Sequence, residues 1–438
     1  MIAAPLVAVL TLMAGLRIGA GEAVQTAQVF AAAPGSATPA GTPYAWQILT
    51  YLEDQGVRET IPMRDLVVVA RRGASEARWT GASNEDGIAE ANFTLPGDGS
   101  VAIEVLRAGA KEPLARGTVE ARPRAITVGE VRARPSKRDG HPIDVFVEGE
   151  RLVVGFPTPI WVQSDGVKSL HVDPEPGLLA DVPLTTCDGW AEIPVTAQSH
   201  VIGLQLTTRD PDGVWFGALP VAPGSFFVGS PRWIAENTQS AAVIVAPNPR
   251  TVVYAEVDDA TGRVAAAALD VKVEPGDPTP RAHWTLPAMA AGLHWLVVSG
   301  EPRGAETLGG AAIARPFLVG KTPGINESDA CSVGPWLARH SVGGFPRWLA
   351  IDGMETRGAN NRARHRAGMA IALIALLSAA ILEVLLLLRS ARETREAMAR
   401  ATADEDAAPA KPGGSLVVGV LVAVLGFAFL AALLIAKA

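Results

Sequence analysis

The sequence predicts a mainly β protein: three tandem β-sandwich modules followed by a two-helix transmembrane hairpin. Short runs of β-branched and aromatic residues, bounded by glycine, proline and aspartate, recur along most of the 438 residues. A short motif repeats at about the length of one β-sandwich module. Two apolar stretches near the C-terminus are each long enough to cross a bilayer as a helix. These three observations set the expected order of elements.

The expected segments follow one another without long gaps. They are a signal peptide (1–23), an Ala/Pro/Gly/Thr-rich linker (24–43), three β-sandwiches (44–122, 125–230 and 231–320), a juxtamembrane segment (321–366), a first transmembrane helix (367–388), a cytoplasmic helical loop (389–414) and a second transmembrane helix (415–436). The length of the chain agrees with this division, because it allows about three domains of ordinary size.

The N-terminus has the composition of a secretory signal peptide. Residues 6–16 are apolar, and small residues follow at Ala20 and Ala23. The positive segment that normally precedes such a core is missing, and Arg17 follows the core instead. A signal peptide would place residues 24–366 on the extracytoplasmic, periplasmic side of the cytoplasmic (inner) membrane.

The repeated motif is a turn that leads into a strand. The pattern D-G-[IW]-A-E occurs at 86–90 and again at 188–192. Asp-Gly pairs supply the positive φ that tight hairpin connections need. A Ca²⁺ ion held by Glu85 and Asp86 is the alternative, but the order of oxygen ligands around Gly87 is not that of an EF-hand loop. The motif therefore predicts a hairpin turn.

The strands are expected at corresponding places in the three modules. Residues 66–70, 159–163 and 251–257 are short β-branched or aromatic runs. The sequence FTLP at 93–96 has a counterpart in WTLP at 284–287, and an alternating run follows each copy. Helical periodicity is absent from this part of the chain, so the modules are expected to be all-β.

The turn-and-strand element resembles the small Ig-like or transthyretin-like β-sandwiches of bacterial envelope proteins, which include macroglobulin-type and carboxypeptidase-regulatory-like domains. Residues 84–89 and 93–96 match the turn and the F-x-l-P strand of those families, and the resemblance covers residues 44–320. It implies a fold and no activity. The Cys-Gly-x-x-Glu-Gln thioester of macroglobulins is absent from the sequence, so their covalent trapping is not implied.

Two apolar stretches predict membrane spans. Residues 367–388 and 415–436 have the length and composition of transmembrane helices. Between them, pairs at i,i+4 spacing such as Arg389 and Glu393 predict a solvated helix. Glu383 lies inside the first stretch. An intramembrane carboxylate is a candidate for a proton or ion role, and the alternative is that it snorkels to the interface or contacts another helix.

Composition argues against several classes of function. The formal net charge of −7 at pH 7 makes nucleic acid an improbable partner. The common signatures of nucleotide-binding loops, serine hydrolases and zinc sites are absent from the sequence. His283 and His294 could approach across a hairpin, but two imidazoles lack an evident third ligand. We therefore expect no catalytic, cofactor-binding or metal-binding residues, although an enzyme site built from distant residues would escape this search.

The two cysteines leave two interpretations open. Cys187 and Cys331 could form a disulfide if the region is exported, since that compartment is oxidising. They could equally be unrelated thiols, because the geometry of approach cannot be read from a sequence.

Tryptophan and arginine gather in the expected juxtamembrane segment. The residues are Trp336, Arg339, Arg347 and Trp348. This composition suits a lipid headgroup boundary or a protein interface. We favour the alternative in which the tryptophans pack beneath the third sandwich, because about twenty residues separate Trp348 from the first apolar stretch.

These observations predict a non-enzymatic, membrane-anchored envelope protein whose extracytoplasmic modules bind a protein or another ligand. The expected partners are the membrane and an envelope protein, and no cofactor is expected. One alternative is a subunit of a membrane transport, secretion or signalling complex that uses the hairpin and Glu383. A second is an envelope hydrolase or binding enzyme with a dispersed site, which predicts close carboxylates or histidines in a pocket at a module junction.

Overall fold

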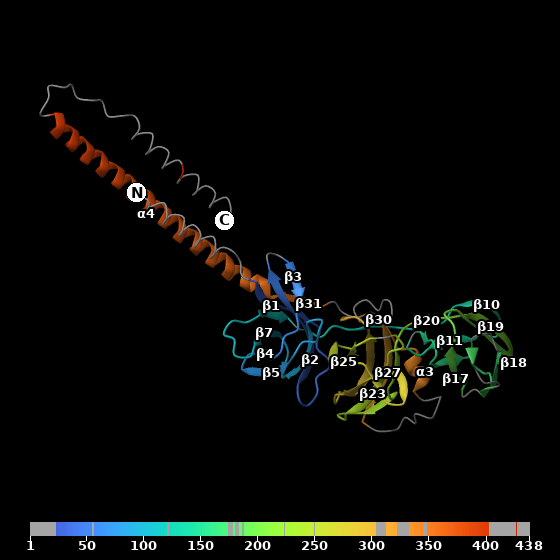
Figure 1. Cartoon of the computed structure of the whole chain (residues 1–438). Coiled ribbons are helices and arrows are strands. Elements are labelled where there is room, and N and C mark those ends of the chain that lie inside the picture. The colour runs from blue at the N-terminus through green and yellow to red at the C-terminus, as the bar shows by residue number, and fades with distance from the viewer. Residues whose placement is uncertain are drawn as a thin grey trace. The chain divides into compact units, whose positions relative to one another are not determined.

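The protein is described from a computed structural model. The described residues are 23–54, 57–120, 122–149, 151–173, 178–179, 184–185, 188–222, 224–248, 250–303, 312–321, 333–344, 348–402 and 426. They divide into two compact units. Residues 25–52 and 59–353 form one unit, named here the β body, and helix α4 (Gly353–Thr402) belongs to the other. Figure 1 shows both with their labels.

Sandwich 1 packs two antiparallel sheets around an aromatic core. Its first sheet contains β3 (Val57–Thr60), β2 (Thr42–Asp54), β1 (Val24–Ala31) and β31 (Leu349–Asp352) in spatial order, with β6 (Ile88–Leu95) also paired to β2. Its second sheet contains β5 (Ser75–Gly81), β4 (Leu66–Arg72), β7 (Ser100–Arg107) and β8 (Ala115–Glu120). Trp46 is fully buried between the sheets, and its ring meets Phe93 edge-on at 5.2 Å. Alternate residues of β7 point inward, as a half-buried strand requires.

Sandwich 2 repeats this arrangement with shorter strands. One sheet contains β10 (Pro135–Gly140), β19 (Asp212–Leu219), β18 (Ile202–Arg209), β14 (Ser169–Asp173) and β16 (Leu184–Thr185). The other contains β11 (Asp144–Val147), β13 (Pro157–Gln163), β17 (Trp190–Ala197) and β15 (Leu178–Leu179), and β12 (Leu152–Val153) pairs in parallel with β20 (Val221–Ala222). Trp215 and aliphatic side chains fill the core.

Sandwich 3 also consists of two sheets. One sheet contains β21 (Phe227–Gly229), β23 (Ser240–Val245), β27 (Asp277–Leu286) and β26 (Lys272–Glu274). The other contains β22 (Trp233–Ala235), β29 (Ile313–Gly320), β28 (Gly292–Ser299), β24 (Val252–Asp259) and β25 (Arg263–Asp270). Strand β25 lies at the edge of its sheet, and this edge faces sandwich 1.

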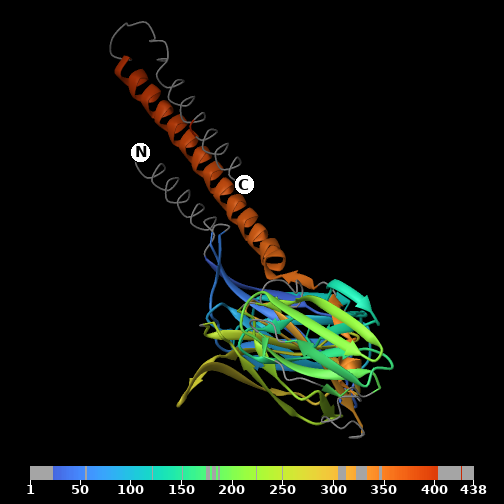
Figure 2. The same ribbon diagram turned by 90° about the vertical axis from the view of Figure 1, so that its right-hand side faces the viewer.

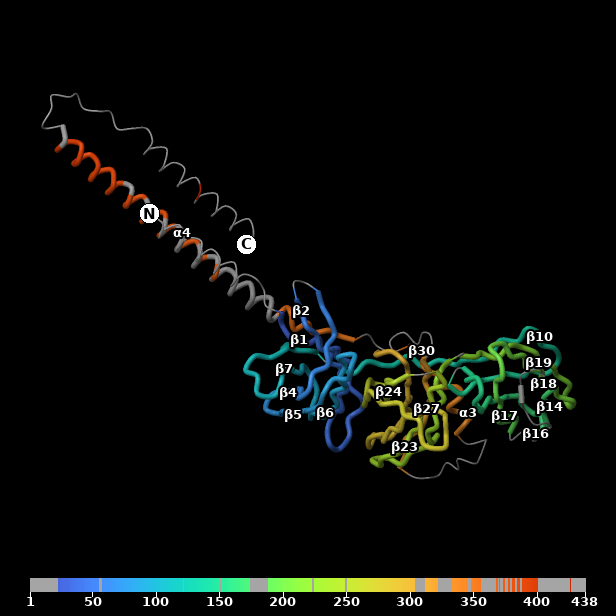
Figure 3. Tube along the Cα trace, viewed as in Figure 1, coloured from blue at the N-terminus to red at the C-terminus, as the bar shows by residue number. Residues whose placement is uncertain are grey.

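A C-terminal strap, residues 333–344 and 348–352, contacts all three sandwiches. Its helix α3 (Gly334–Ala338) packs against β13 and β29. Strand β30 (Ser341–Gly344) pairs with β9 (Thr127–Gly129), which connects sandwiches 1 and 2, and β31 pairs with β1. Figure 3 shows the orange strap running beside strands of much earlier sequence.

The β prediction is confirmed for the described residues. Strands β4 and β13 include the runs expected at 66–70 and 159–163, and β24 includes the run expected at 251–257 except for Thr251. The segment 24–43, expected as a linker, contains β1. Local composition could not reveal this strand, because β31, one of its partners, lies at the other end of the β body.

The expected two-helix transmembrane hairpin is wrong. Residues 367–388 are not a separate span. They lie within α4, which appears as one unbroken helix in Figure 2 and carries charge at both ends, from Glu355 to Arg400. In the part of the chain that the structure describes, no helix combines the length and the apolar character needed to cross a membrane. The second expected span, 415–436, lies outside the described residues except for Gly426.

The location expected from the transmembrane hairpin is corrected together with the hairpin. A two-pass protein of the cytoplasmic membrane, with residues 24–366 on its periplasmic side, is not supported, because it required both spans. The signal peptide expected at 1–23 lies outside the described residues but for Ala23. The i,i+4 pairing expected after the first stretch is present, since Arg389 and Glu393 form a 3.0 Å ion pair on α4.

The D-G-[IW]-A-E motif forms a turn in both places. Gly87 has φ +77° and Gly189 has φ +80°. In the first copy, the side-chain Oδ1 of Asn84 accepts hydrogen bonds from the backbone N–H groups of Asp86 (3.1 Å) and Ile88 (2.9 Å). The acidic run is therefore organised by an asparagine turn.

We predict that Gly87→Ala destabilises the protein more than Gly97→Ala does. Both glycines have positive φ, which costs a non-glycine residue about 1–2 kcal/mol. At Gly87 an added Cβ would also lie 2.8 Å from the carbonyl oxygen of Thr50, whereas nothing lies within 4 Å at Gly97. The overlap should add about 1–3 kcal/mol. Urea unfolding of both variants measures the difference, and equal losses would contradict the prediction.

Candidate functional site

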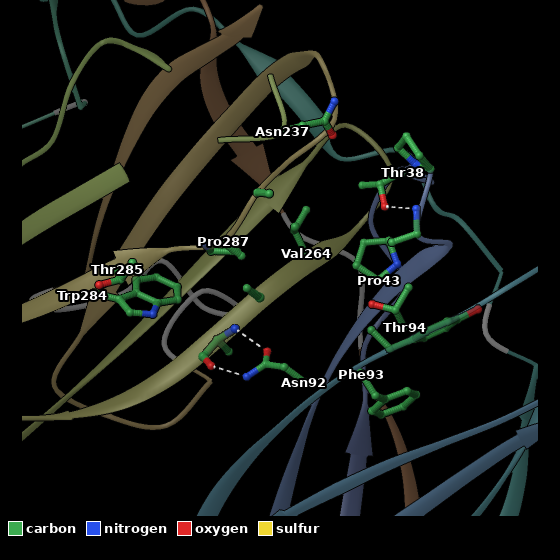
Figure 4. Close-up of a pocket in the computed structure, with 16 residues that line it drawn as sticks. Thr38, Pro43, Asn92, Phe93, Thr94, Asn237, Val264, Trp284, Thr285 and Pro287 are labelled. Carbon is green, nitrogen blue, oxygen red and sulfur yellow. Dashed lines mark hydrogen bonds between the residues drawn. The ribbon is translucent and has the colours of Figure 1, made fainter. Parts of the chain in front are cut away.

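Sandwiches 1 and 3 meet through two strands, β6 and β25. The side chain of Asn92 on β6 bonds the backbone of Ala266 on β25 twice: its Nδ2 donates to the carbonyl oxygen at 2.8 Å, and its Oδ1 accepts from the N–H at 2.9 Å. Figure 4 shows this pair of bonds. One side chain thus satisfies the polar backbone of an edge strand, which would otherwise be open to another strand.

A pocket of about 620 Å³ lies beside this contact. Its apolar lining comes from both sandwiches, chiefly from Pro39, Pro43, Val264, Trp284 and Pro287. None of its lining residues is Asp, Glu, Lys, Arg, His or Cys. The volume lies in the range of ordinary small-ligand sites.

Some polar groups of the pocket are occupied and others are free. The hydroxyl of Thr38 donates to the carbonyl oxygen of Gly41 at 3.1 Å, and the Asn92 amide holds β25. The side chains of Thr94, Thr285 and Asn237 are exposed, and none has a hydrogen-bond partner among the described residues. These three groups can bond a ligand without breaking a bond of the protein.

The sequence repeat supplies both walls of this pocket. Phe93 and Thr94 of the FTLP copy lie on the sandwich 1 side, and Trp284 and Thr285 of the WTLP copy lie on the sandwich 3 side. The sequence marked both copies as strand signals only. The similarity between them was the signal available for the site, but nothing local indicated that the two copies face one cavity.

A buried guanidinium holds the junction behind the pocket. Arg263 of β25 lies among carboxylates: its Nη1 donates to Glu90 of β6 at 2.9 Å, and its Nε lies 2.5 Å from an oxygen of Glu256. The side chains of all three are at most 7% exposed. Gln47 of β2 donates to the other oxygen of Glu90 at 2.8 Å. Charge pairing and hydrogen bonds together compensate the burial.

The strap covers this guanidinium. The indole of Trp348 lies over the Arg263 guanidinium, with 4.6 Å between the Cζ atom and the ring centroid. Trp348 therefore packs at the junction of sandwiches 1 and 3. The expectation that it serves as an interface residue stays a prediction.

More carboxyl groups are buried around this guanidinium than its single positive charge can neutralise. Asp258 is 5% exposed, and its Oδ2 has no hydrogen-bond partner among the described residues. Burial, reinforced by the neighbouring Glu256, raises the pKa of Asp258 well above its usual value. Asp259 instead accepts backbone hydrogen bonds from Ser36 (2.6 Å) and Thr261 (2.7 Å), so it stabilises the turn between β24 and β25.

Titratable groups also meet at the edge of the junction. The hydroxyl of Tyr254 donates to Asp86 at 3.2 Å and accepts from Asn84 at 3.1 Å, so the first Asp-Gly turn contacts sandwich 3. Burial raises the pKa of Tyr254 to about 12. Burial also lowers the pKa of His294, which is 1% exposed. His283 is exposed and pairs with Glu274, so the two histidines do not form one site.

A second charge network joins sandwiches 2 and 3. Arg232 donates from Nη2 to Glu148 (2.9 Å) and to Glu192 (2.6 Å), and Arg315 lies 3.5 Å from Glu148. These residues connect β strands and loops of the two modules and leave a hollow of only about 30 Å³. We regard this network as structural.

The other residues singled out by the sequence are scattered. Cys187, Cys331 and Arg347 lie outside the described residues, so the disulfide stays a prediction. Glu383 lies on α4, but its side chain is outside the description. Among the described residues no group of three or more His, Cys, Asp and Glu side chains is arranged to hold a metal ion.

The remaining two strap residues differ in exposure. Arg339 packs on sandwich 2, with its Cζ 4.7 Å from the Trp190 ring centroid. Trp336 is 39% exposed and stacks on His340 at 3.9 Å. The packing expected from the sequence concerned the tryptophans, so the contact of Arg339 with sandwich 2 was not predicted. The interface role expected for Trp336 and Arg339 stays a prediction.

No known protein family matches the chain, and no curated protein does. Among solved structures it is similar to invasin, a bacterial integrin-binding protein, at 13% identity over 68% of this chain and 60% of that chain (TM-score 0.17). A Bacteroides ovatus protein of a mixed-linkage glucan utilization locus is similar at 11% identity over 60% of this chain and 62% of that chain (TM-score 0.17). An ICAM-5 ectodomain fragment is similar at 13% identity over 68% of this chain and 77% of that chain (TM-score 0.16).

These neighbours are Ig-like or related β-sandwich proteins, and the chain spans less than two thirds of the first two. Similarity at this level carries no argument about function. The finer resemblance to macroglobulin-type or carboxypeptidase-regulatory-like domains has no family match to support it.

We predict that Arg263→Met destabilises the β body by about 3–5 kcal/mol, because Glu90 and Glu256 would remain buried without their cation. The matched control is Arg71→Met. Arg71 forms ion pairs with Glu76 and Glu104 on an exposed surface that water screens, so its loss should cost much less than the loss of Arg263. Urea unfolding measures both, and a small loss for Arg263→Met would show that the buried network contributes little.

We predict that Asp258→Asn reduces the loss of stability at rising pH. With its raised pKa, Asp258 holds a proton in the folded state after the unfolded state has released it. The folded state then binds more protons, so stability falls as pH rises from about 4 through the folded-state pKa. Asparagine keeps the shape and stays neutral. Unfolding midpoints from about pH 4 to about pH 8 measure the effect, with exposed Asp98→Asn as control; parallel profiles for wild type and Asp258→Asn would contradict it.

Proposed function

We propose that this protein is a non-enzymatic binding protein whose junction pocket, between sandwiches 1 and 3, holds an uncharged ligand. The observation that carries the proposal is the pocket lining. It combines apolar side chains with free hydroxyl and amide groups and contains no acidic or basic side chain. A charged ligand would lose its hydration there without gaining a counter-charge.

The enzyme alternative predicted close carboxylates or histidines at a module junction. Carboxylates do gather at this junction, but Glu90 and Glu256 are engaged by Arg263, and Asp259 is engaged by backbone N–H groups. None of them lines the pocket. General acid–base chemistry needs a titratable group within reach of the ligand. The arrangement favours binding over catalysis.

The walls of the pocket are well suited to binding because they are held in place beforehand. Asn92 bonds β6 to β25, and the pairing of Arg263 on β25 with Glu90 on β6 connects the same two strands. A preformed site loses less conformational entropy when a ligand binds. The exposed ring of Trp336 would suit binding of a protein partner. The pocket supports binding of a small ligand more specifically.

We predict that filling the pocket abolishes binding of small neutral molecules. Ala288 lines the pocket and is exposed, so Ala288→Trp should occupy the space without disturbing a core. The matched control is Ala218→Trp, at an exposed position of β19 in sandwich 2. Ligand-observed NMR with a panel of neutral, anionic and cationic fragments is the measurement.

Neutral fragments should bind the wild type and Ala218→Trp, and binding to Ala288→Trp should be at least about tenfold weaker. Preferential binding of charged fragments, or equal binding by the two tryptophan variants, would count against the proposal.

A further inference from the structure

We propose that the ligand of the junction pocket is a neutral oligosaccharide, which stacks on Trp284 and bonds Thr94, Thr285 and Asn237. This inference rests on the proposed function, because it names the ligand class of the same pocket. It depends on one aromatic surface, three free polar side chains and the state of the surrounding backbone.

Trp284 provides the stacking surface. It lies on β27, partly packed against the core of sandwich 3 and partly exposed in the pocket. Figure 4 shows its indole on one side of the cavity, with Pro43 and Thr94 on the other. The face of an indole attracts polarised C–H groups, and a sugar ring presents a row of such groups on one face. The indole is held in place by the core of sandwich 3, so it needs no rearrangement before a sugar ring stacks on it.

The free polar groups lie on both walls of the pocket and match the hydroxyl groups of a sugar. Thr94 and Thr285 each offer one hydroxyl, and Asn237 offers a carboxamide, so all three can donate and accept. Sugar hydroxyls have the same dual character. A purely apolar ligand would cover these groups and leave them without hydrogen bonds, which is costly. The pocket therefore favours a ligand with many neutral hydroxyls.

The backbone around the pocket argues against a peptide. A peptide that adds to a sheet needs free N–H and C=O groups along a strand edge. On β25 the backbone of Ala266 is already bonded by Asn92. Three lining residues, Pro39, Pro43 and Pro287, have no N–H to donate. Recognition must therefore come from side chains, as it does when rings stack and hydroxyls bond.

The surrounding charge argues against acidic sugars. Glu90 and Glu256 lie in the junction and share Arg263 as their cation, and Asp259 lies nearby and accepts a backbone hydrogen bond from Ser36. Arg263 is buried and turned toward the carboxylates, so it is not available to a ligand carboxylate. A neutral oligosaccharide avoids both the repulsion and the desolvation of a charged group.

The test uses the full chain and five probes: cellohexaose, maltoheptaose, xylohexaose, an oligogalacturonate as the acidic counterpart and decaproline as the peptide counterpart. Saturation-transfer NMR and calorimetry measure binding to the wild type, Trp284→Ala, Trp284→Phe and Thr285→Val. The control is Trp336→Ala, which removes an exposed tryptophan remote from the pocket lining. Thermal unfolding of each variant establishes that it is folded, and the near-isosteric Thr285→Val serves if Trp284→Ala is not.

At least one neutral oligosaccharide should bind, and the oligogalacturonate should not. Trp284→Ala should weaken binding at least about tenfold and Thr285→Val about threefold, whereas Trp284→Phe and Trp336→Ala should stay within about threefold of the wild type.

The inference is overturned if none of the neutral oligosaccharides binds, or if their binding is independent of Trp284. It is also overturned if decaproline binds more tightly with the same dependence on Trp284. Neutral fragments separate the two proposals. If they occupy the pocket while the oligosaccharides do not, the ligand class is wrong and the proposed function stands; if neither binds, both proposals fail.

Discussion

The arrangement of sandwiches 1 and 3 depends on the guanidinium of Arg263. A charge buried to this degree must keep its partners, and they come from two modules: Glu256 from sandwich 3, and Glu90 with the carbonyl oxygen of Ala45 from sandwich 1. Sliding one module against the other would uncover the carboxylates without their cation. The junction therefore has one low-energy register, and the pocket beside it inherits a fixed shape.

Modules in tandem usually move independently of one another. Here buried polar contacts join sandwich 3 both to sandwich 1 and to sandwich 2. The Arg232 network secures sandwich 2 to sandwich 3, and the strap adds an aromatic cover over Arg263 and a helix against Trp161. Buried polar contacts are specific in geometry, whereas apolar contacts tolerate sliding. The body is thus organised by a small number of directional interactions placed between modules, and the apolar cores serve each module separately.

Local features of the sequence predicted local features of the fold. Runs such as 66–70 became strands and Asp86-Gly87 became a turn, because β-branched residues and positive φ act within a few residues. The pocket was not predictable, since only tertiary structure brings Phe93 and Trp284 to the lining of one cavity. Hydropathy misled the interpretation of residues 367–388, which lie inside a longer helix with charged ends. The strand partners of the strap were not predictable for a similar reason, as they lie far away along the chain.

Sandwich 1 touches sandwich 3, while sandwich 2 is the part of the chain synthesised between them. The junction therefore closes a loop that contains a whole folded module, and its contacts have a large sequence separation. Sandwich 1 leaves the ribosome with Glu90 lacking its cation Arg263 and with Asn92 lacking the backbone of Ala266, and both gain these partners only after β25 has emerged. The ligand site is consequently assembled late. A chain truncated after sandwich 2 could retain two well-packed cores and still have no pocket.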